Sequence, residues 1–278
     1  MLRDITLGQY YITDSKLHRL DPRVKLAGTM LYIISVFVLN GLLGYFIAFA
    51  FFAAMVRISK VPFKFIVKGL KAVIFILILT AACNLIFSKG EHVLVSFGII
   101  NISIEGIETA ICMAIRLIML ILGTSVMTLT TTPNDLTDGI EKSMGFLEKV
   151  KIPVHDIALM MSIALRFIPI LVEETNKIMK AQISRGADFE SGGIIKRVKN
   201  YIPIIVPLFI SSFHRASDLA MAMESRCYTS GRERTKLYPL KYKKSDYRAY
   251  ALLLAYFILV ISFKCIFVYN GINGFWTV

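Results

Sequence analysis

The sequence contains few residue patterns that could support catalysis or bind a metal. Its cysteines, Cys83, Cys112, Cys227 and Cys265, include no Cys-x-x-Cys pair, and three of them fall in apolar stretches where cysteine usually acts as a small hydrophobic residue. The four histidines are equally scattered, without His-Glu-x-x-His or another metal-ligand spacing. We therefore expect no disulfide, no metal site and no bound cofactor.

Nucleotide-binding and hydrolase motifs are also missing. The chain has no Gly-x-x-x-x-Gly-Lys-Ser/Thr, so it lacks a phosphate-binding loop of its own. It has no Gly-x-Ser-x-Gly, and no apolar stretch holds the paired acids that proton-relay transporters use. We expect no catalytic residue, and the energy for any uphill transport would have to come from a partner.

The composition indicates a chain with separate membrane and aqueous parts. Apolar residues make up 56% of it and the mean hydropathy is +0.64, which is too apolar for a soluble domain, while 18% charged residues is too many for a chain buried in lipid throughout. The net charge of +13 is compatible with nucleic-acid binding, anionic lipid or an orientation signal for membrane insertion. The positions of the charges distinguish these three possibilities.

Long uncharged runs predict membrane-spanning helices, since a bilayer core needs about 18 or more apolar residues. The first run, 26–56, is too long for one span, and Asn40, Gly41 and Gly44 favour a turn in its middle. We predict five spans, at about 26–41, 43–57, 71–88, 107–131 and 249–269. Between the third and fourth, residues 89–106 alternate in places like a strand, or form an ordered external loop.

Basic residues support this count. With five spans, 29 of the 32 lysines and arginines lie on the side of the N-terminus, as the positive-inside rule requires, whereas a single first span would place the cluster Arg57–Lys71 outside. The charge then sets orientation in the bilayer, with a cytoplasmic N-terminus and an extracellular C-terminus, and we expect no nucleic-acid partner. No cleaved targeting peptide is expected, because the first apolar run exceeds the about 7–15 residues of a signal core.

The predicted fold class is an all-α integral membrane protein with a cytoplasmic coupling domain of long amphipathic helices between spans four and five. Its parts are an N-terminal membrane domain, 1–131, the coupling domain, 132–248, and a C-terminal span, 249–278. The coupling domain should begin with a short amphipathic helix that starts at Thr132-Pro133 and stops near Ile152-Pro153.

Two long helices of similar design follow. The first runs from Val154 to about Gly186 with a kink at Pro169, and the second is weakened at Pro203 and Pro207. Each helix is apolar in its first part and polar in its last part, and it ends on Ser-Arg followed by a small residue. One interpretation is that a cation at the C-terminal end of a helix stabilises it by about 0.3–1 kcal/mol, because it offsets the helix macrodipole. Alternatively, a planar guanidinium at a helix end is a docking element for a partner's groove.

Long stretches of the chain resemble the transmembrane T subunit of energy-coupling factor (ECF) transporters, the EcfT and CbiQ-like family. They include "GQYYITDSKLHRLDPRVKL", "EGIETAICMAIRLIMLILGTSVMTLTTTPNDLTDGIE" and "VHDIALMMSIALRFIPILVEETNKIMKAQISRGADF". In that family two Ala-Arg-Gly signatures end two coupling helices. By position they correspond here to Ser184-Arg185-Gly186 and Ser225-Arg226-Cys227. Cys227 departs most, because a side chain at positive φ costs about 1 kcal/mol, so the second helix is expected to end differently from the first.

The resemblance implies a non-catalytic subunit of an ABC-type importer in the bacterial cell membrane. Its partners would be two cassette ATPase subunits (EcfA- and EcfA′-like), whose grooves would bind the arginine-tipped helix ends. A further partner would be an S subunit that binds the transported vitamin or metal ion. The alternatives are an ATP-independent carrier or channel and a membrane enzyme. Arg116, near mid-membrane, and Arg166, near the Pro169 kink, are interpreted as structural groups.

Overall fold

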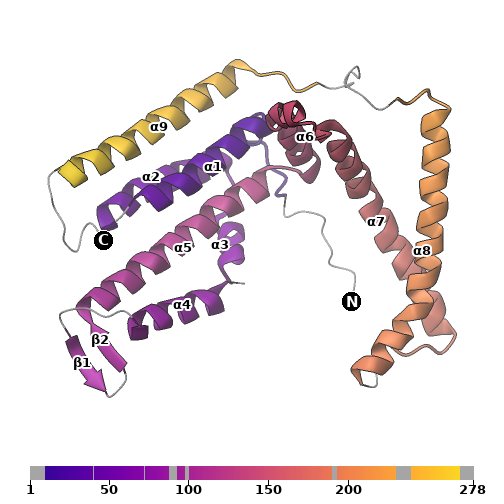
Figure 1. The fold of residues 1–278 in the computed structure, drawn as a ribbon, viewed down its shortest axis with the longest axis horizontal. Helices are drawn as coiled ribbons and strands as arrows, with labels where there is room; N and C mark the ends of the chain where they lie inside the picture. The colour runs from indigo at the N-terminus through magenta and orange to yellow at the C-terminus, as the bar shows by residue number, and fades with distance from the viewer. Residues whose placement is uncertain are drawn as a thin grey trace. The chain divides into compact units, whose positions relative to one another are not determined.

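The computed structural model describes residues 10–39, 41–71, 73–87, 93–97, 100–189, 193–229 and 239–269. Helices dominate these residues (Figure 1), and one short two-stranded sheet accompanies them. The chain divides into two compact units. We call residues 8–140 with 240–278 the bundle unit, and residues 141–239 the hairpin unit.

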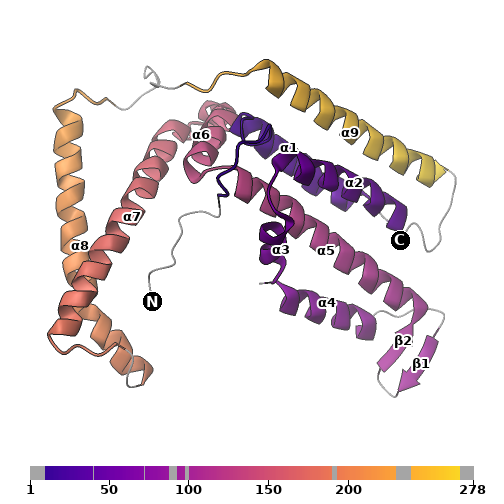
Figure 2. The same cartoon turned by 180° about the vertical axis from the view of Figure 1, so that it is seen from behind.

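Four long apolar helices form the core of the bundle unit. They are α1 (Pro22–Val38), α2 (Gly41–Ser59), α5 (Ile104–Thr130) and α9 (Lys244–Tyr269). Helices α1 and α2 both pack against α5, and α9 packs along α1 (Figure 2). Phe51 stacks on Tyr256 with ring centroids 4.0 Å apart, and the Tyr256 hydroxyl lies 2.7 Å from the Ser35 hydroxyl. A Cβ on Gly123 would lie 2.2 Å from the Tyr32 ring, so α1 and α5 approach closely at a glycine.

The start of each helix follows from local sequence. Asp21 caps α1 by accepting the Arg23 N–H, with Pro22 at the first helical position. Ser103 caps α5 by accepting the Gly106 N–H. α1 and α2 are separated by an extended Leu39 and by Gly41 at φ 78°, which confirms the predicted turn within the first apolar run. Asn40 lies outside the described residues.

The predicted third span is broken in the structure. Residues 71–88 correspond to the end of α3 (Phe63–Lys71) and to α4 (Ile74–Phe87), which meet at an angle of 60°. α3 is amphipathic, with Ile66 fully buried and Lys64, Lys68 and Lys71 exposed, whereas α4 is apolar and uncharged. Strands β1 (Val93–Phe97) and β2 (Ile100–Ser103) then pair antiparallel, which settles the strand-or-loop alternative for these residues.

Three helices are long and apolar enough to cross a membrane: Gly106–Thr130, Val154–Ser184 and Lys244–Ile266. The bent pair α3 and α4 would add a fourth, and Leu43–Ser59 is apolar but shorter. These segments and the many exposed apolar side chains confirm the predicted class, a helical integral membrane protein. The number of five spans stays a prediction.

Polar groups fasten the helix ends of the bundle unit together. The Lys25 ammonium donates to the backbone carbonyls of Thr130, at the end of α5, and His18, at 2.8 and 3.0 Å. Asp246, which is 1% exposed, accepts the backbone N–H groups of Asp21 at 3.1 Å and Lys243 at 2.6 Å. Burial lowers the pKa of Lys25 to about 8. The starts of α1 and α9 and the end of α5 are therefore held by direct hydrogen bonds.

Helix α6 (Pro133–Ser143) leads towards the hairpin unit. Its cap is as predicted, because the Thr132 hydroxyl accepts the Asp135 N–H at 3.1 Å. It does not reach Ile152, however. The chain tightens into a 3-10 helix, Gly145–Val150, and then turns at Lys151, which has a φ of 64°. Gly145 is a poor helix former, and this explains the early end.

The hairpin unit consists mainly of α7 (Val154–Ser184) and α8 (Ile194–Glu224), 31 residues each. Pro169 lies inside α7, and Pro203 and Pro207 lie inside α8. α8 changes direction within its first half, the part that contains both prolines (Figure 1). The predicted bounds of α7, Val154 to about Gly186, are confirmed to within about two residues.

Candidate functional site

The first predicted tip is a regular C-terminal cap of α7. The Ala187 N–H donates to the Gln182 carbonyl at 3.0 Å, and the Gly186 N–H donates to the Ile183 carbonyl at 2.9 Å. This pair of bonds defines a Schellman motif, with Gly186 at φ 87° and Arg185 as the last residue before the reversal. The motif satisfies the last carbonyls of the helix, so the Arg185 side chain is not needed for that purpose.

The second tip repeats the motif, which corrects the expectation that Cys227 would change the helix end. The Tyr228 N–H donates to the Met223 carbonyl at 3.0 Å, and the Cys227 N–H donates to the Glu224 carbonyl at 2.9 Å. Cys227 adopts a φ of 54° and so occupies the place of Gly186. The two hydrogen bonds are worth about 1 kcal/mol each, which offsets the about 1 kcal/mol cost of the left-handed conformation.

The serines of the two signatures face their own helices. The Ser184 hydroxyl donates to the Lys180 carbonyl at 3.1 Å, and the Ser225 hydroxyl donates to the Ala222 carbonyl at 3.0 Å. A serine in place of alanine therefore adds no outward polar group at either tip. The exposed cations of the two signatures are Arg185 and Arg226.

Both arginines are exposed and available to a partner. Among the described residues, neither the Arg185 nor the Arg226 guanidinium forms an ion pair or a side-chain hydrogen bond. Exposed apolar side chains also occur in the last turns of the two helices, with Ile183 54% and Met221 58% exposed. An always-charged planar guanidinium at an exposed helix end suits a carboxylate-containing protein groove.

The packing of α7 on α8 fixes the spacing of the tips. The Arg215 guanidinium pairs with the Glu174 carboxylate at 2.7 Å, and the rings of Phe189 and Tyr201 lie 5.5 Å apart. The Gln182 amide donates to the Pro203 carbonyl at 3.5 Å. That carbonyl is the one left without an intrahelical donor by Pro207, four residues later.

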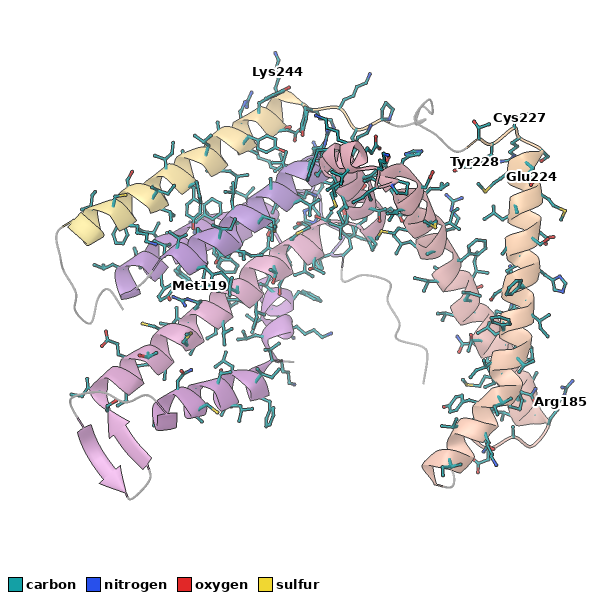
Figure 3. All side chains as sticks on the ribbon, viewed as in Figure 1. Met119, Arg185, Glu224, Cys227, Tyr228 and Lys244 are labelled. Atoms are coloured by element: carbon teal, nitrogen blue, oxygen red, sulfur yellow. The ribbon has the colours of Figure 1, made fainter. Side chains whose placement is uncertain are left out.

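These contacts place the two tips far apart within the hairpin unit. Arg185 is three residues beyond Gln182, which contacts Pro203, whereas Arg226 lies 23 residues beyond Pro203 along α8. At about 1.5 Å per residue, the two guanidinium positions are separated by about 35 Å. Figure 3 shows Arg185 beside the lower part of α8 and Cys227 at its upper end. One partner groove of ordinary size cannot hold both tips.

The remaining predicted residues have separate environments. Arg116 donates to the Tyr45 hydroxyl at 3.0 Å and lies near the faces of Phe37 and Tyr45. These contacts join Arg116 of α5 to α1 and α2. Arg166 is exposed, and no described side chain forms an ion pair with it.

Sequence reasoning missed the groups that hold the helices together. Glu174 and Arg215 are 41 residues apart, and their spacing carries no signal until α7 and α8 are paired. The role of Asp246 was also not predicted, although a lone acid among lysines just before an apolar run is a helix-cap signal. In the described part of the chain no group of three or more His, Cys, Asp or Glu side chains is arranged to hold a metal.

The fold defines a class: a polytopic helical membrane protein with a long helical hairpin whose two tips each end on an exposed arginine. The profile of the CbiQ family, described as cobalt transport protein, matches residues 13–237. Among curated proteins, the energy-coupling factor transporter transmembrane protein EcfT of Clostridium kluyveri is 49% identical over 250 residues, which cover 90% of this chain and 93% of the relative.

Two further EcfT proteins are similar over nearly their whole length. That of Ruminiclostridium cellulolyticum is 46% identical over 96% of this chain and 100% of its own, and that of Acidaminococcus fermentans is 46% identical over 94% and 97%. The chain therefore belongs to the CbiQ family, as an EcfT-type transmembrane component of an energy-coupling factor transporter.

Proposed function

We propose that this chain is the mechanical coupling subunit of its transporter, and that Arg185 and Arg226 each dock in one of two cassette ATPase subunits. The proposal rests on one observation: two exposed arginines lie about 35 Å apart in the hairpin unit, each at the end of a helix with a Schellman cap. ATP-driven approach of the ATPases would displace the tips, and α7 and α8 would transmit that motion to the bundle unit.

In this proposal the N-terminus and the region 132–248 are cytoplasmic and the C-terminus is extracellular, in the bacterial cell membrane. A separate S subunit binds the transported vitamin or metal ion. Hydrolysis belongs to the ATPases, so this chain needs no catalytic side chain of its own. An ATP-independent carrier would instead transport substrate when the ATPases are absent.

The test is co-purification with the cassette ATPases, comparing wild type with Arg185→Glu, Arg226→Glu and the double variant. A matched control is Lys177→Glu with Lys199→Glu, which reverses two exposed cations on the same helices away from the tips. We expect the double variant to insert normally but to lose the ATPases and substrate uptake, because each reversed charge meets the partner's carboxylates. The control should retain both.

Three results would contradict the proposal. One is an unchanged complex with unchanged uptake in the double arginine variant. Another is equal loss in the lysine control, which would indicate a general charge effect. The third is extracellular labelling of cysteines placed at Ser184 or Ser225, since the tips must face the cytoplasm while residues 89–103 face outward.

A further inference from the structure

A basic pocket lies in the bundle unit, away from both arginine tips. It has a volume of about 400 Å³ and lies between the segment that precedes α1 and the end of α2. Its lining residues are Asp14, Ser15, Lys16, Arg19, Arg57, Ile58 and Lys60. Four cations and one carboxylate thus converge on one hollow, and the pocket favours an anion.

Three of the four cations form no ion pair with a described residue. Arg19 forms a bidentate pair with the Asp14 carboxylate. Within the described residues, no ion pair or hydrogen bond engages the side chains of Lys16, Arg57 or Lys60. The Asp14 pKa is lowered mainly by the hydrogen bond from Arg19, and the charges of Arg19 and Lys60 contribute. The pocket therefore keeps about three uncompensated positive charges at neutral pH.

The frame of the pocket is ordered by contacts that do not involve these cations. Ser15 is 3% and Leu17 7% exposed, and the Ser15 hydroxyl lies 2.7 Å from Nδ1 of His18. The Tyr11 N–H donates to the Leu129 carbonyl at 2.9 Å. The cations are thus presented by a backbone that is already fixed.

Lys60 provides an independent indication of a site. It has a φ of 55°, in the left-handed region that follows the last turn of α2 and that favours glycine. A lysine there costs of order 1 kcal/mol relative to an unstrained backbone. A charged side chain kept at a strained position beside other unpaired cations is typical of a binding site.

Apolar surface adjoins the pocket. Ile58, which lines it, is 44% exposed, and Phe63 at the start of α3 is 56% exposed. The part of α2 from Leu43 to Ser59 is apolar and ends at the pocket. A free phosphate needs only the charges, whereas a phospholipid needs a basic pocket at the end of an apolar helix, with exposed apolar side chains to contact its acyl chains.

We infer that this pocket binds the phosphate headgroup of an anionic phospholipid through Lys16, Arg57 and Lys60. The inference is independent of ATPase docking, because none of these residues belongs to the hairpin unit. Bound lipid would anchor the α2 to α3 turn at the membrane surface.

The test is native mass spectrometry of the full chain, with its co-purifying subunits, titrated in neutral detergent with phosphatidylglycerol or with phosphatidylcholine of the same acyl chains. The pocket variant is Lys16→Gln, Arg57→Gln and Lys60→Gln together. The matched control is Lys64→Gln, Lys68→Gln and Lys71→Gln, three exposed cations of α3 that do not line the pocket.

We expect the pocket variant to bind phosphatidylglycerol about a hundredfold more weakly, since about fivefold is lost per cation near the headgroups. The control should change by no more than about threefold. Phosphatidylcholine binding should be equal in all variants, and exchanging Lys and Arg at the three pocket positions should preserve affinity. Equal losses in pocket and control variants would overturn the inference. So would full displacement of phosphatidylglycerol by excess inorganic phosphate, which would indicate a free-anion site.

Lys60→Gly keeps the test decisive if the triple variant does not fold. Glycine relieves the strain, so the thermal unfolding temperature should rise while phosphatidylglycerol binding weakens about fivefold. Greater stability with unchanged lipid binding would mean that Lys60 is only a turn residue, and would overturn its assignment.

Discussion

The cost of a side chain at positive φ predicts opposite changes in stability for one substitution in each of the two helix caps. Gly186 and Cys227 occupy the same position in the same Schellman motif, at φ 87° and 54°. A Cβ added to Gly186 meets nothing within 4 Å, so Gly186→Ala carries only the cost of placing a side chain in the left-handed region. That cost is about 1 kcal/mol. Cys227→Gly removes a similar cost and should stabilise the second cap.

Hydrogen exchange in the last turns of α7 and α8 is the suitable assay, because a cap changes local opening before global unfolding. About 1 kcal/mol corresponds to about fivefold in the opening equilibrium. Amides near residues 182–187 should exchange about fivefold faster in Gly186→Ala, and those near residues 223–228 more slowly in Cys227→Gly. Cys227→Ala is the control, since it removes the thiol and keeps the strain. Slower exchange in that variant would refute the reasoning, because the sulfur and not φ would be responsible.

Three further outcomes follow from the bundle unit. Gly123→Ala should lower the unfolding temperature by an amount equivalent to about 1–3 kcal/mol, because its Cβ would lie 2.2 Å from the Tyr32 ring. Asp246→Ala should cost about 1–3 kcal/mol, since it leaves two backbone N–H groups without an acceptor, and Asp246→Asn should cost less. Burial lowers the pKa of His18 below 6.5, so its contribution to stability is present above about pH 6.5 and is lost as the pH falls through the lower pKa of the folded state. Hydrogen exchange near residues 10–20 should accelerate at acidic pH in the wild type but not in His18→Gln.

The helices of this protein were predictable because their signals are local. Thr132-Pro133 starts a helix as predicted, and the run from Val154 to Ser184 is one helix because its interior proline falls within a long apolar and amphipathic pattern. The arginine tips were also predictable, since Ser-Arg and a small residue end both helices. Their common cap geometry was not, because the sequence alone does not reveal that hydrogen bonds can hold Cys227 at positive φ.

Interactions between distant segments could not be predicted from the sequence. The pairs Arg215–Glu174 and Asp246 with the Asp21 N–H join residues 41 and 225 positions apart. The break between α3 and α4 was missed for a different reason. Hydropathy averaged over 71–88 is high, whereas the amphipathic pattern of α3 lies mostly before Lys71, outside the predicted span.

Composition alone would allow α7 to cross the membrane, but the distribution of its charges argues against that. The apolar stretch 157–172 has 16 residues, about 24 Å of helix, and already contains Arg166. A bilayer core is about 30 Å thick, so a crossing α7 would also draw Glu173, Glu174 or Asp156 into hydrocarbon. α8 is not among the helices that are apolar enough to cross a membrane, so the chain would not return after a crossing α7. Arg185 and the basic residues before α9 would then lie on the opposite side of the membrane from the cluster Arg57–Lys71, against the positive-inside rule. A helix that rests its apolar half against membrane or partner surface, and extends its charged half into water, satisfies both the length and the charges.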